Sequence, residues 1–185
     1  IVINDGIIKT IDSSSTEAAI YNGSTLTITG GFVESTGAYG ILTQGTLNIG
    51  KDNEELDTTK PIIKGATYGV YISGNTTNFY DGILKGKTSG YYGEFSSVSD
   101  GALINSGTEI INSQEYNTNY LVKQQDFLEV NGKKYNSFEK ALSNIESSGT
   151  IKVIADANIN YAMTIPKEKE VILDLNSHMI TTTVM

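Results

Sequence analysis

Tyrosine is the residue type in this sequence whose number and placement best suit the binding of a ligand. The 185 residues include eleven Tyr, five Phe and no Trp. Side chains alternate between the two faces of a strand, so Tyr71 points outward if Val70 and Ile72 point inward. The same alternation predicts that Tyr80 is exposed, together with at least one ring of the next Tyr pair, which we take to be Tyr92.

Exposed Tyr rings stack on sugars or anchor a protein partner, because each ring combines an apolar body with a polar tip. Tyr71, Tyr80 and Tyr92 are therefore the candidate ligand-binding residues. The alternative is that Tyr fills these positions only because its β-propensity is high.

Ligands for a metal ion are sparse in this sequence. The stretch Asp52–Asp57 carries four carboxylates and one amide, which are oxygen donors that Ca²⁺ accepts. The spacing of a known calcium loop is absent, so we favour a solvated acidic loop and predict no cofactor. His178 is the single histidine and is expected in a turn, and the absence of Cys excludes disulfides and thiolate sites.

The charge of the chain argues against nucleic acid as a partner. The formal net charge is −8, and all thirteen basic residues are Lys. Neutralising phosphates requires a basic face, which this composition does not favour. No apolar run approaches the length of a membrane span, and we expect the chain to be a piece of a longer protein, since it begins without Met.

A pattern of three short strands separated by turns recurs along the first two-thirds of the sequence. Its copies are aligned on Ala19, Gly40, Gly69 and Gly101, which gives steps of 21, 29 and 32 residues. One such rung cannot bury its Leu and Ile alone, but stacked rungs bury them in a continuous column. The variable step predicts that one corner accepts insertions, at Lys51–Lys60 and Lys87–Asp100.

Apolar and polar residues alternate within the strands of each rung. Thr25–Ile28 shows this pattern clearly, so one face of the strand points to a core and the other to water. Tyr39 and Tyr68 are in phase with Ile41 and Val70, and we therefore expect these two rings in the core.

These residues resemble the pectate-lyase-like right-handed parallel β-helix superfamily, whose rungs have three strands and loops of variable size. The unit Gly45-Thr46-Leu47-Asn48-Ile49 is similar to β-helices in large surface proteins of low-GC Gram-positive bacteria. The resemblance implies an all-β, right-handed parallel β-helix with rungs of roughly 21–32 residues over residues 1–122. It does not imply one function, because this fold hosts lyases, hydrolases and adhesins.

The catalytic residues of that superfamily are not matched. Its polygalacturonase-like hydrolases use clustered Asp, whereas the adjacent acidic pair here, Glu54-Glu55, lies in an insertion. Elimination of the pectate-lyase type uses an Arg or Lys base beside carboxylate-bound Ca²⁺, but Arg is absent and no carboxylates cluster at matching rung positions.

A second unit is predicted for residues 123–185. Asn131-Gly132 lies between the segments Phe127–Val130 and Lys133–Tyr135, and this arrangement is typical of a β-hairpin. A short helix is expected near 137–146, capped by Asn136 and ended by Gly149. Strands should follow at Thr150–Ala155, around Thr164-Ile165 and at Glu170–Leu175.

The segment Leu173–His178 resembles the start of a fresh β-helix in such surface proteins, except that Ser177 replaces the expected Gly. We favour two solenoid units with the helix as a plug between them. The alternative is that the helix caps or packs beside the first solenoid.

The sequence as a whole favours a non-catalytic segment of a secreted or cell-surface bacterial protein. Its expected role is adhesion or scaffolding, with a glycan or a host surface protein as the partner. The alternative is a polysaccharide lyase or glycoside hydrolase whose catalytic residues lie outside these 185 residues.

Overall fold

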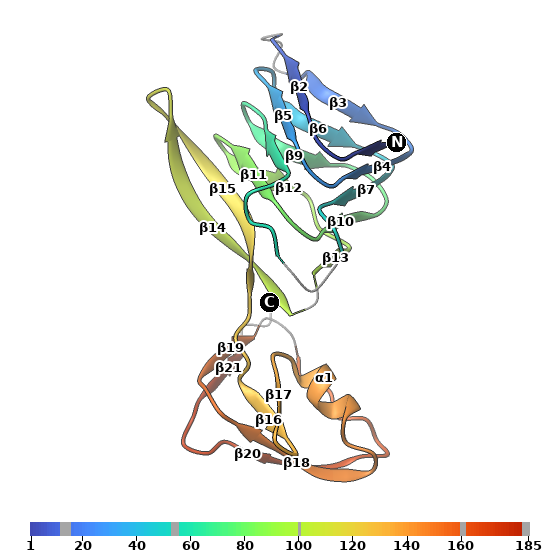
Figure 1. The fold of residues 1–185 in the computed structure, drawn as a ribbon, viewed down its shortest axis with the longest axis vertical. Helices are drawn as coiled ribbons and strands as arrows, with labels where there is room; N and C mark the ends of the chain where they lie inside the picture. Colours follow the sequence, from blue (N-terminus) through green and yellow to red (C-terminus); the bar gives the residue numbers. More distant parts are fainter. Residues whose placement is uncertain (12–15, 53–55, 100, 160–161, 183–185) are drawn as a thin grey trace. The chain divides into compact units, whose positions relative to one another are not determined.

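The computed structural model describes residues 1–11, 16–52, 56–99, 101–159 and 162–182. These residues form two compact units, Ile1–Lys123 and Gln124–Met185 (Figure 1). Each unit has its own hydrophobic core.

Unit 1 is a β-solenoid with three parallel sheets, which confirms the predicted fold class. Sheet A contains β1 (Val2–Ile3), β4 (Thr25–Ile28), β7 (Thr46–Ile49), β10 (Thr77–Phe79) and β13 (Ser97–Val98). Sheet B contains β2 (Ile7–Thr10), β5 (Phe32–Ser35), β8 (Ile62–Lys64) and β11 (Ile83–Gly86). Sheet C contains β3 (Ala18–Asn22), β6 (Tyr39–Thr43), β9 (Tyr68–Ile72) and β12 (Ser89–Tyr92).

The core of unit 1 is a column of aliphatic side chains stacked from rung to rung. Leu26 pairs in register with Leu47, and Ile28 with Ile49, and all four side chains are buried. Phe79 continues this column, since it is the register partner of Ile49 in β10. Apolar side chains therefore meet because the parallel register aligns the same position of successive rungs.

The structure corrects the last rung predicted from the sequence. Val70 pairs with Tyr91, so the rung after β9 begins at β12 and not at Gly101. The predicted insertion Lys87–Asp100 accordingly contains β12 and β13, which are regular strands of the solenoid. The sequence of β12 is Ser-Gly-Tyr-Tyr, without the aliphatic residues that mark the corresponding strand of the other rungs. A pattern based on aliphatic residues therefore did not identify this rung.

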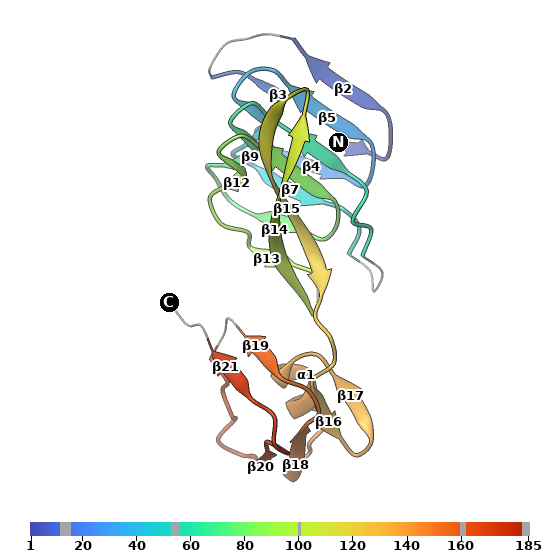
Figure 2. The ribbon, with the colours of Figure 1, turned by 90° about the vertical axis from the view of Figure 1, so that its left-hand side faces the viewer.

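Residues beyond Gly101 form an antiparallel hairpin and not a further rung. The strands β14 (Ala102–Ile111) and β15 (Gln114–Lys123) pair along their full length. The turn residues Asn112 and Ser113 both have positive φ, as a two-residue turn of type I′ requires. The strand β15 joins sheet B beside β11, and β14 is the last strand of that sheet (Figures 1 and 2).

Unit 2 opens with the predicted hairpin, β16 (Leu128–Val130) and β17 (Lys133–Tyr135), around Asn131-Gly132. Two parallel pairs follow. The first joins β18 (Ser148–Val153) to β20 (Glu170–Asp174), and the second joins β19 (Ala157–Ile159) to β21 (Ile180–Thr182). That these pairs begin a second solenoid stays a prediction.

Three expectations for unit 2 were wrong in detail. The helix α1 spans Phe138–Ser143, and its N-cap is Ser137, whose side chain accepts from the Lys140 amide, in place of Asn136. It ends at Asn144, while Gly149 lies inside β18. The short strand expected at Thr164-Ile165 occurs instead at 157–159, because pairing with β21 selects it.

The turn after β20 contains a residue in an unfavourable backbone conformation. Ser177 has φ of 64° and Asn176 has φ of 45°, and the His178 amide donates to the Leu175 carbonyl at 2.7 Å. The turn predicted for His178 is thus present, with Ser at a position that suits Gly. Asn tolerates this left-handed region better than Ser does.

Ser177→Gly is therefore expected to stabilise unit 2 by about 1 kcal/mol, because Gly has no Cβ to strain this conformation. The free energy of unfolding is measured by chemical denaturation, with hydrogen exchange of the β20 amides as the readout for unit 2. Ser147→Gly, in the exposed segment before β18, is the control. An equal or negative effect of Ser177→Gly would contradict the expectation.

Candidate ligand-binding face

Four tyrosines gather on the outer surface of sheet C. Tyr71 and Tyr92 are register partners in β9 and β12, and Tyr39 and Tyr68 are register partners in β6 and β9. We call these four residues the tyrosine face. The parallel register places each ring beside the ring of the next rung.

The rings of the tyrosine face form one contacting group. The centroid of Tyr71 lies 4.7 Å from that of Tyr39 and 4.7 Å from that of Tyr92, with which it is stacked at 12°. Tyr68 lies 5.5 Å from Tyr92 and 6.2 Å from Tyr39. These distances fall within the range of favourable aromatic pairs, so the rings hold one another in place.

Exposure differs across the tyrosine face. Tyr92 is 50 % exposed and is the most accessible of the four, whereas Tyr71 is half-buried between its neighbours. Desolvation by the neighbouring rings raises the pKa of the Tyr71 hydroxyl, and the nearby phenols of Tyr92, Tyr39 and Tyr68 raise it further. The Tyr71 hydroxyl is a potential hydrogen-bond donor and acceptor for a ligand.

The structure overturns the expectation that Tyr39 and Tyr68 are core residues. Both are half-buried on the outer surface and contact Tyr71. Each precedes a glycine, Gly40 or Gly69, and in both strands the glycine and the next residue are buried consecutively. Alternation fails at these glycines, so counting in twos from Ile41 placed the rings on the wrong face.

Tyr80 does not join the tyrosine face. It follows β10 in sheet A, is half-buried, and its hydroxyl lies 3.4 Å from the Ser97 hydroxyl. The Tyr80 carbonyl accepts from Ser99 at 2.7 Å. Of the three candidates, the structure thus brings together Tyr71 and Tyr92 and places Tyr80 just after β10 of sheet A.

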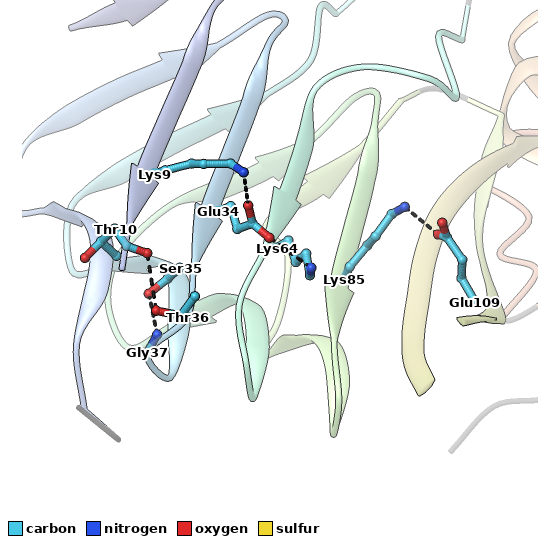
Figure 3. Close-up of polar contacts among 9 residues, drawn as sticks. All are labelled: Lys9, Thr10, Glu34, Ser35, Thr36, Gly37, Lys64, Lys85 and Glu109. Carbon is cyan, nitrogen blue, oxygen red and sulfur yellow. Dashed lines mark hydrogen bonds and ion pairs between the residues drawn. The ribbon is translucent and has the colours of Figure 1, made fainter. Parts of the chain in front are cut away.

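A row of charged side chains lies on the outer surface of sheet B, which the sequence reasoning missed (Figure 3). Lys9, Glu34, Lys64 and Lys85 are successive register partners in β2, β5, β8 and β11. Each of them closes a third-strand motif of the repeat, so a charge recurring at that position was the available signal. We call these four residues the charge row.

Every member of the charge row has an opposite partner. Glu34 contacts Lys9 at 2.7 Å and Lys64 at 2.9 Å, and Lys85 pairs with Glu109 of β14. The Lys64 amine also lies 4.5 Å from the centre of the Tyr116 ring. Burial raises the pKa of Glu34, but hydrogen bonds from both lysines lower it more, so its pKa lies below the usual value.

The carboxylate of Asp81, next to sheet A, accepts hydrogen bonds from backbone amides. Asp81 is buried and accepts from the amides of Lys51 at 3.1 Å and Asp57 at 2.7 Å. Burial raises the pKa of Asp81, while these amides oppose the rise. Asp81 therefore clamps the ends of the insertion near β7, a structural role.

Metal-ligand geometry is not found among the described residues, where no three His, Asp or Glu side chains gather. Asn53, Glu54 and Glu55 lie outside the described residues, so the acidic loop remains a prediction. Within the described part of the chain, no helix is long and apolar enough to cross a membrane.

A groove lies beside α1 in unit 2, lined by apolar residues that include Phe138, Leu142 and Met163. Its lysine, Lys169, donates to the carbonyls of Leu142 at 2.7 Å and Ile145 at 2.6 Å. A cation at these carbonyls stabilises the end of a helix. The lysine of this groove is thus engaged in holding α1 in place.

No protein-family model matches this chain, and comparisons with curated proteins and with solved structures find no match either. The β-solenoid architecture is therefore established by the structure alone. The resemblance to the pectate-lyase-like superfamily stays a prediction.

Proposed function

We propose that this chain is a non-catalytic β-solenoid segment of a secreted or cell-surface protein, and that it binds a glycan through the tyrosine face. The observation that carries the proposal is the group of four contacting Tyr rings on the outer surface of sheet C. The solenoid acts as the scaffold that spaces these rings.

Tyr rings in this arrangement suit a carbohydrate chemically. A sugar presents apolar C–H faces beside hydroxyl groups, and Tyr presents an apolar ring beside a hydroxyl. The rings repeat at the spacing of parallel strands, about 4.8 Å. An extended glycan can therefore contact several rings along the sheet.

The order imposed on the rings also favours binding. Tyr71 is flanked on both sides at 4.7 Å, so little side-chain freedom remains to be lost when a ligand arrives. Tyr92, half-exposed at the end of the row, offers the largest accessible surface. We expect Tyr92 to make the first contact with the glycan and Tyr71 to hold the Tyr92 ring in position.

A glycan array followed by calorimetry tests the proposal. Tyr92→Ala and Tyr71→Ala are expected to weaken binding of the best glycan at least tenfold, or about 1.4 kcal/mol each. The matched control is Tyr80→Ala, which removes the same type of side chain just after β10 and should leave affinity within about twofold.

Two outcomes would count against this function. The first is a wild-type chain that binds no glycan on the array although its far-ultraviolet circular dichroism is that of a folded β protein. The second is an equal loss in all three Tyr variants, because that result would assign the effect to stability and not to the tyrosine face.

A further inference from the structure

The strand β14 presents a long open edge. It is the terminal strand of sheet B, and within the described residues only β15 pairs with it. The closing pair of the two-residue turn, Ile111 and Gln114, is hydrogen-bonded in hairpins of this type. Counting back from Ile111, the even-numbered residues of β14 direct their N–H and C=O groups to the open edge.

One contact supports this assignment. The Ser106 amide donates to its neighbour's side chain, Asn105 Oδ1, at 2.9 Å. This amide therefore does not bond to β15, and in a paired edge it would exchange the Asn105 side chain for a carbonyl of the neighbouring strand.

Apart from the local bond at Ser106, the edge lacks the usual features that keep sheet edges apart. Natural proteins protect an edge with Pro, Lys, bulges or short strands. The strand β14 is ten residues long, contains no Pro or Lys, and pairs with β15 without a bulge. Its one charged residue, Glu109, pairs with Lys85 of the same chain.

The sequence of this edge is symmetric in chemical character about Gly107. Equal steps outward from Gly107 pair Ser with Thr, Asn with Glu, Ile with Ile and Leu with Ile, in the order Ser106–Thr108, Asn105–Glu109, Ile104–Ile110 and Leu103–Ile111. An antiparallel copy centred on Gly107 would oppose apolar to apolar and polar to polar. It would also bring even-numbered residues opposite even-numbered ones, as hydrogen bonding across the edge requires.

A neighbouring register does not have this match. Shifting the centre to Ser106 keeps the hydrogen bonds but sets Leu103 against Glu109 and Ile104 against Thr108. In the register centred on Gly107, Glu109 meets the Asn105 amide and not another carboxylate. Ile110, which is 67 % exposed in the single chain, meets Ile104.

We propose that two copies of this chain pair antiparallel through their β14 edges, with Gly107 on the two-fold axis. The contact is isologous, so it closes as a dimer and does not extend into a fibre. Stable complexes bury roughly 1,200–2,000 Å², and smaller interfaces are typical of weak association. For a contact confined to one pair of strand edges we therefore expect a dissociation constant in the micromolar range.

Cysteine crosslinking tests the register directly, because the chain has no Cys of its own. Opposed residues that are not hydrogen-bonded have Cα atoms about 4.5 Å apart, within disulfide range. A Cβ at Gly107 would lie 3.2 Å from Thr118 Oγ1, a contact that this side chain can relieve. Gly107→Cys should therefore form a disulfide-linked dimer as the main product of mild oxidation.

Thr108→Cys is the matched control. Thr108 of one copy would oppose Ser106 of the other. The two Thr108→Cys thiols would therefore be offset by about 7 Å along the strands, in addition to the separation between the two strands. That separation exceeds disulfide reach, and the variant should stay monomeric on a denaturing gel. Equal crosslinking of both variants, or of neither, would overturn the proposed register.

A charge pair tests the same contact in solution. Asn105→Glu sets a carboxylate opposite Glu109 twice in each dimer, and Asn105→Lys sets an ammonium there. Both changes remove the bond from Asn105 Nδ2 to the Tyr120 hydroxyl at 3.2 Å, and both replace the Asn105 Oδ1 that accepts from the Ser106 amide at 2.9 Å. Sedimentation should show dimerisation weakened at least tenfold by Asn105→Glu and retained or tightened by Asn105→Lys.

Wild-type protein that sediments as a monomer up to about 100 times the expected micromolar dissociation constant would overturn the proposal. In that case the open edge would be available to a strand of another protein. A dimer that Asn105→Lys weakens as much as Asn105→Glu would also overturn it, since the register predicts repulsion only for Asn105→Glu.

Discussion

Gly45→Ala is expected to destabilise the solenoid by about 3 kcal/mol, at the upper end of the cost of overpacking. An added Cβ would lie 2.0 Å from the Ser24 carbonyl oxygen and 2.6 Å from the Ser24 amide nitrogen. Both atoms belong to the backbone, and the Ser24 carbonyl also accepts from the Thr46 amide at 2.7 Å. The stacked rungs must therefore separate, since no side chain can move aside.

Gly23→Ala is the matched control for this prediction. Gly23 lies in the turn of the preceding rung, beside Ser24, yet a Cβ there would meet nothing within 4 Å. Its replacement should change stability by less than about 1 kcal/mol. Hydrogen exchange of β4 and β7 during denaturation provides the measurement, and similar losses for the two variants would contradict the stacking argument.

Glu34→Ala is expected to destabilise unit 1 by about 2–4 kcal/mol, because it leaves the Lys64 ammonium without its counter-ion. The side chain of Lys64 is only 10 % exposed, and Glu34 is its carboxylate partner at 2.9 Å. Lys9 is affected less, since its side chain is 54 % exposed and water can replace the carboxylate.

Lys64→Met should be much milder than Glu34→Ala. Met keeps the apolar stem against Tyr116 and removes the buried charge, while Glu34 retains Lys9 as its partner. Replacing a buried charge with an apolar side chain of similar volume is often close to neutral. Equal losses in the two variants would show that the ion pair is not what holds this part of sheet B.

The contribution of Glu34 also predicts a pH dependence. Its pKa is lowered in the folded state from the ordinary value of 4.5, so its stabilising effect is present above that value. The effect is lost as the pH falls through the folded pKa. The stability difference between wild type and Glu34→Ala should therefore be constant near neutral pH and shrink below about pH 4.5.

The sequence predicted the repeating parts of this protein well. Short alternating strands and turn glycines are local features, and they identified rungs aligned on Ala19, Gly40 and Gly69, as well as the Asn131-Gly132 hairpin. The step of 21 residues from Leu26 to Leu47 is confirmed by their register. These features depend on neighbouring residues and on the two-residue period of a strand, both of which can be recognised in the sequence.

The parts that the sequence missed depend on contacts between rungs. Tyr39 and Tyr68 lie on the outer surface and not in the core, because the alternation of buried and outward side chains fails at the glycines that follow them. The hairpin after Gly101 looked like a rung because local alternation does not distinguish parallel from antiparallel pairing.

Local sequence thus determined that this protein is a stack of three-strand rungs with a different second unit. Only the tertiary structure decided which side chains meet across the rungs. It grouped Tyr71 and Tyr92 with Tyr39 and Tyr68, and separated them from Tyr80. The physical reason is that the register between rungs brings together residues about 20 to 30 positions apart in the sequence. The loops that set this register vary in length, and local propensity carries no information over such a separation.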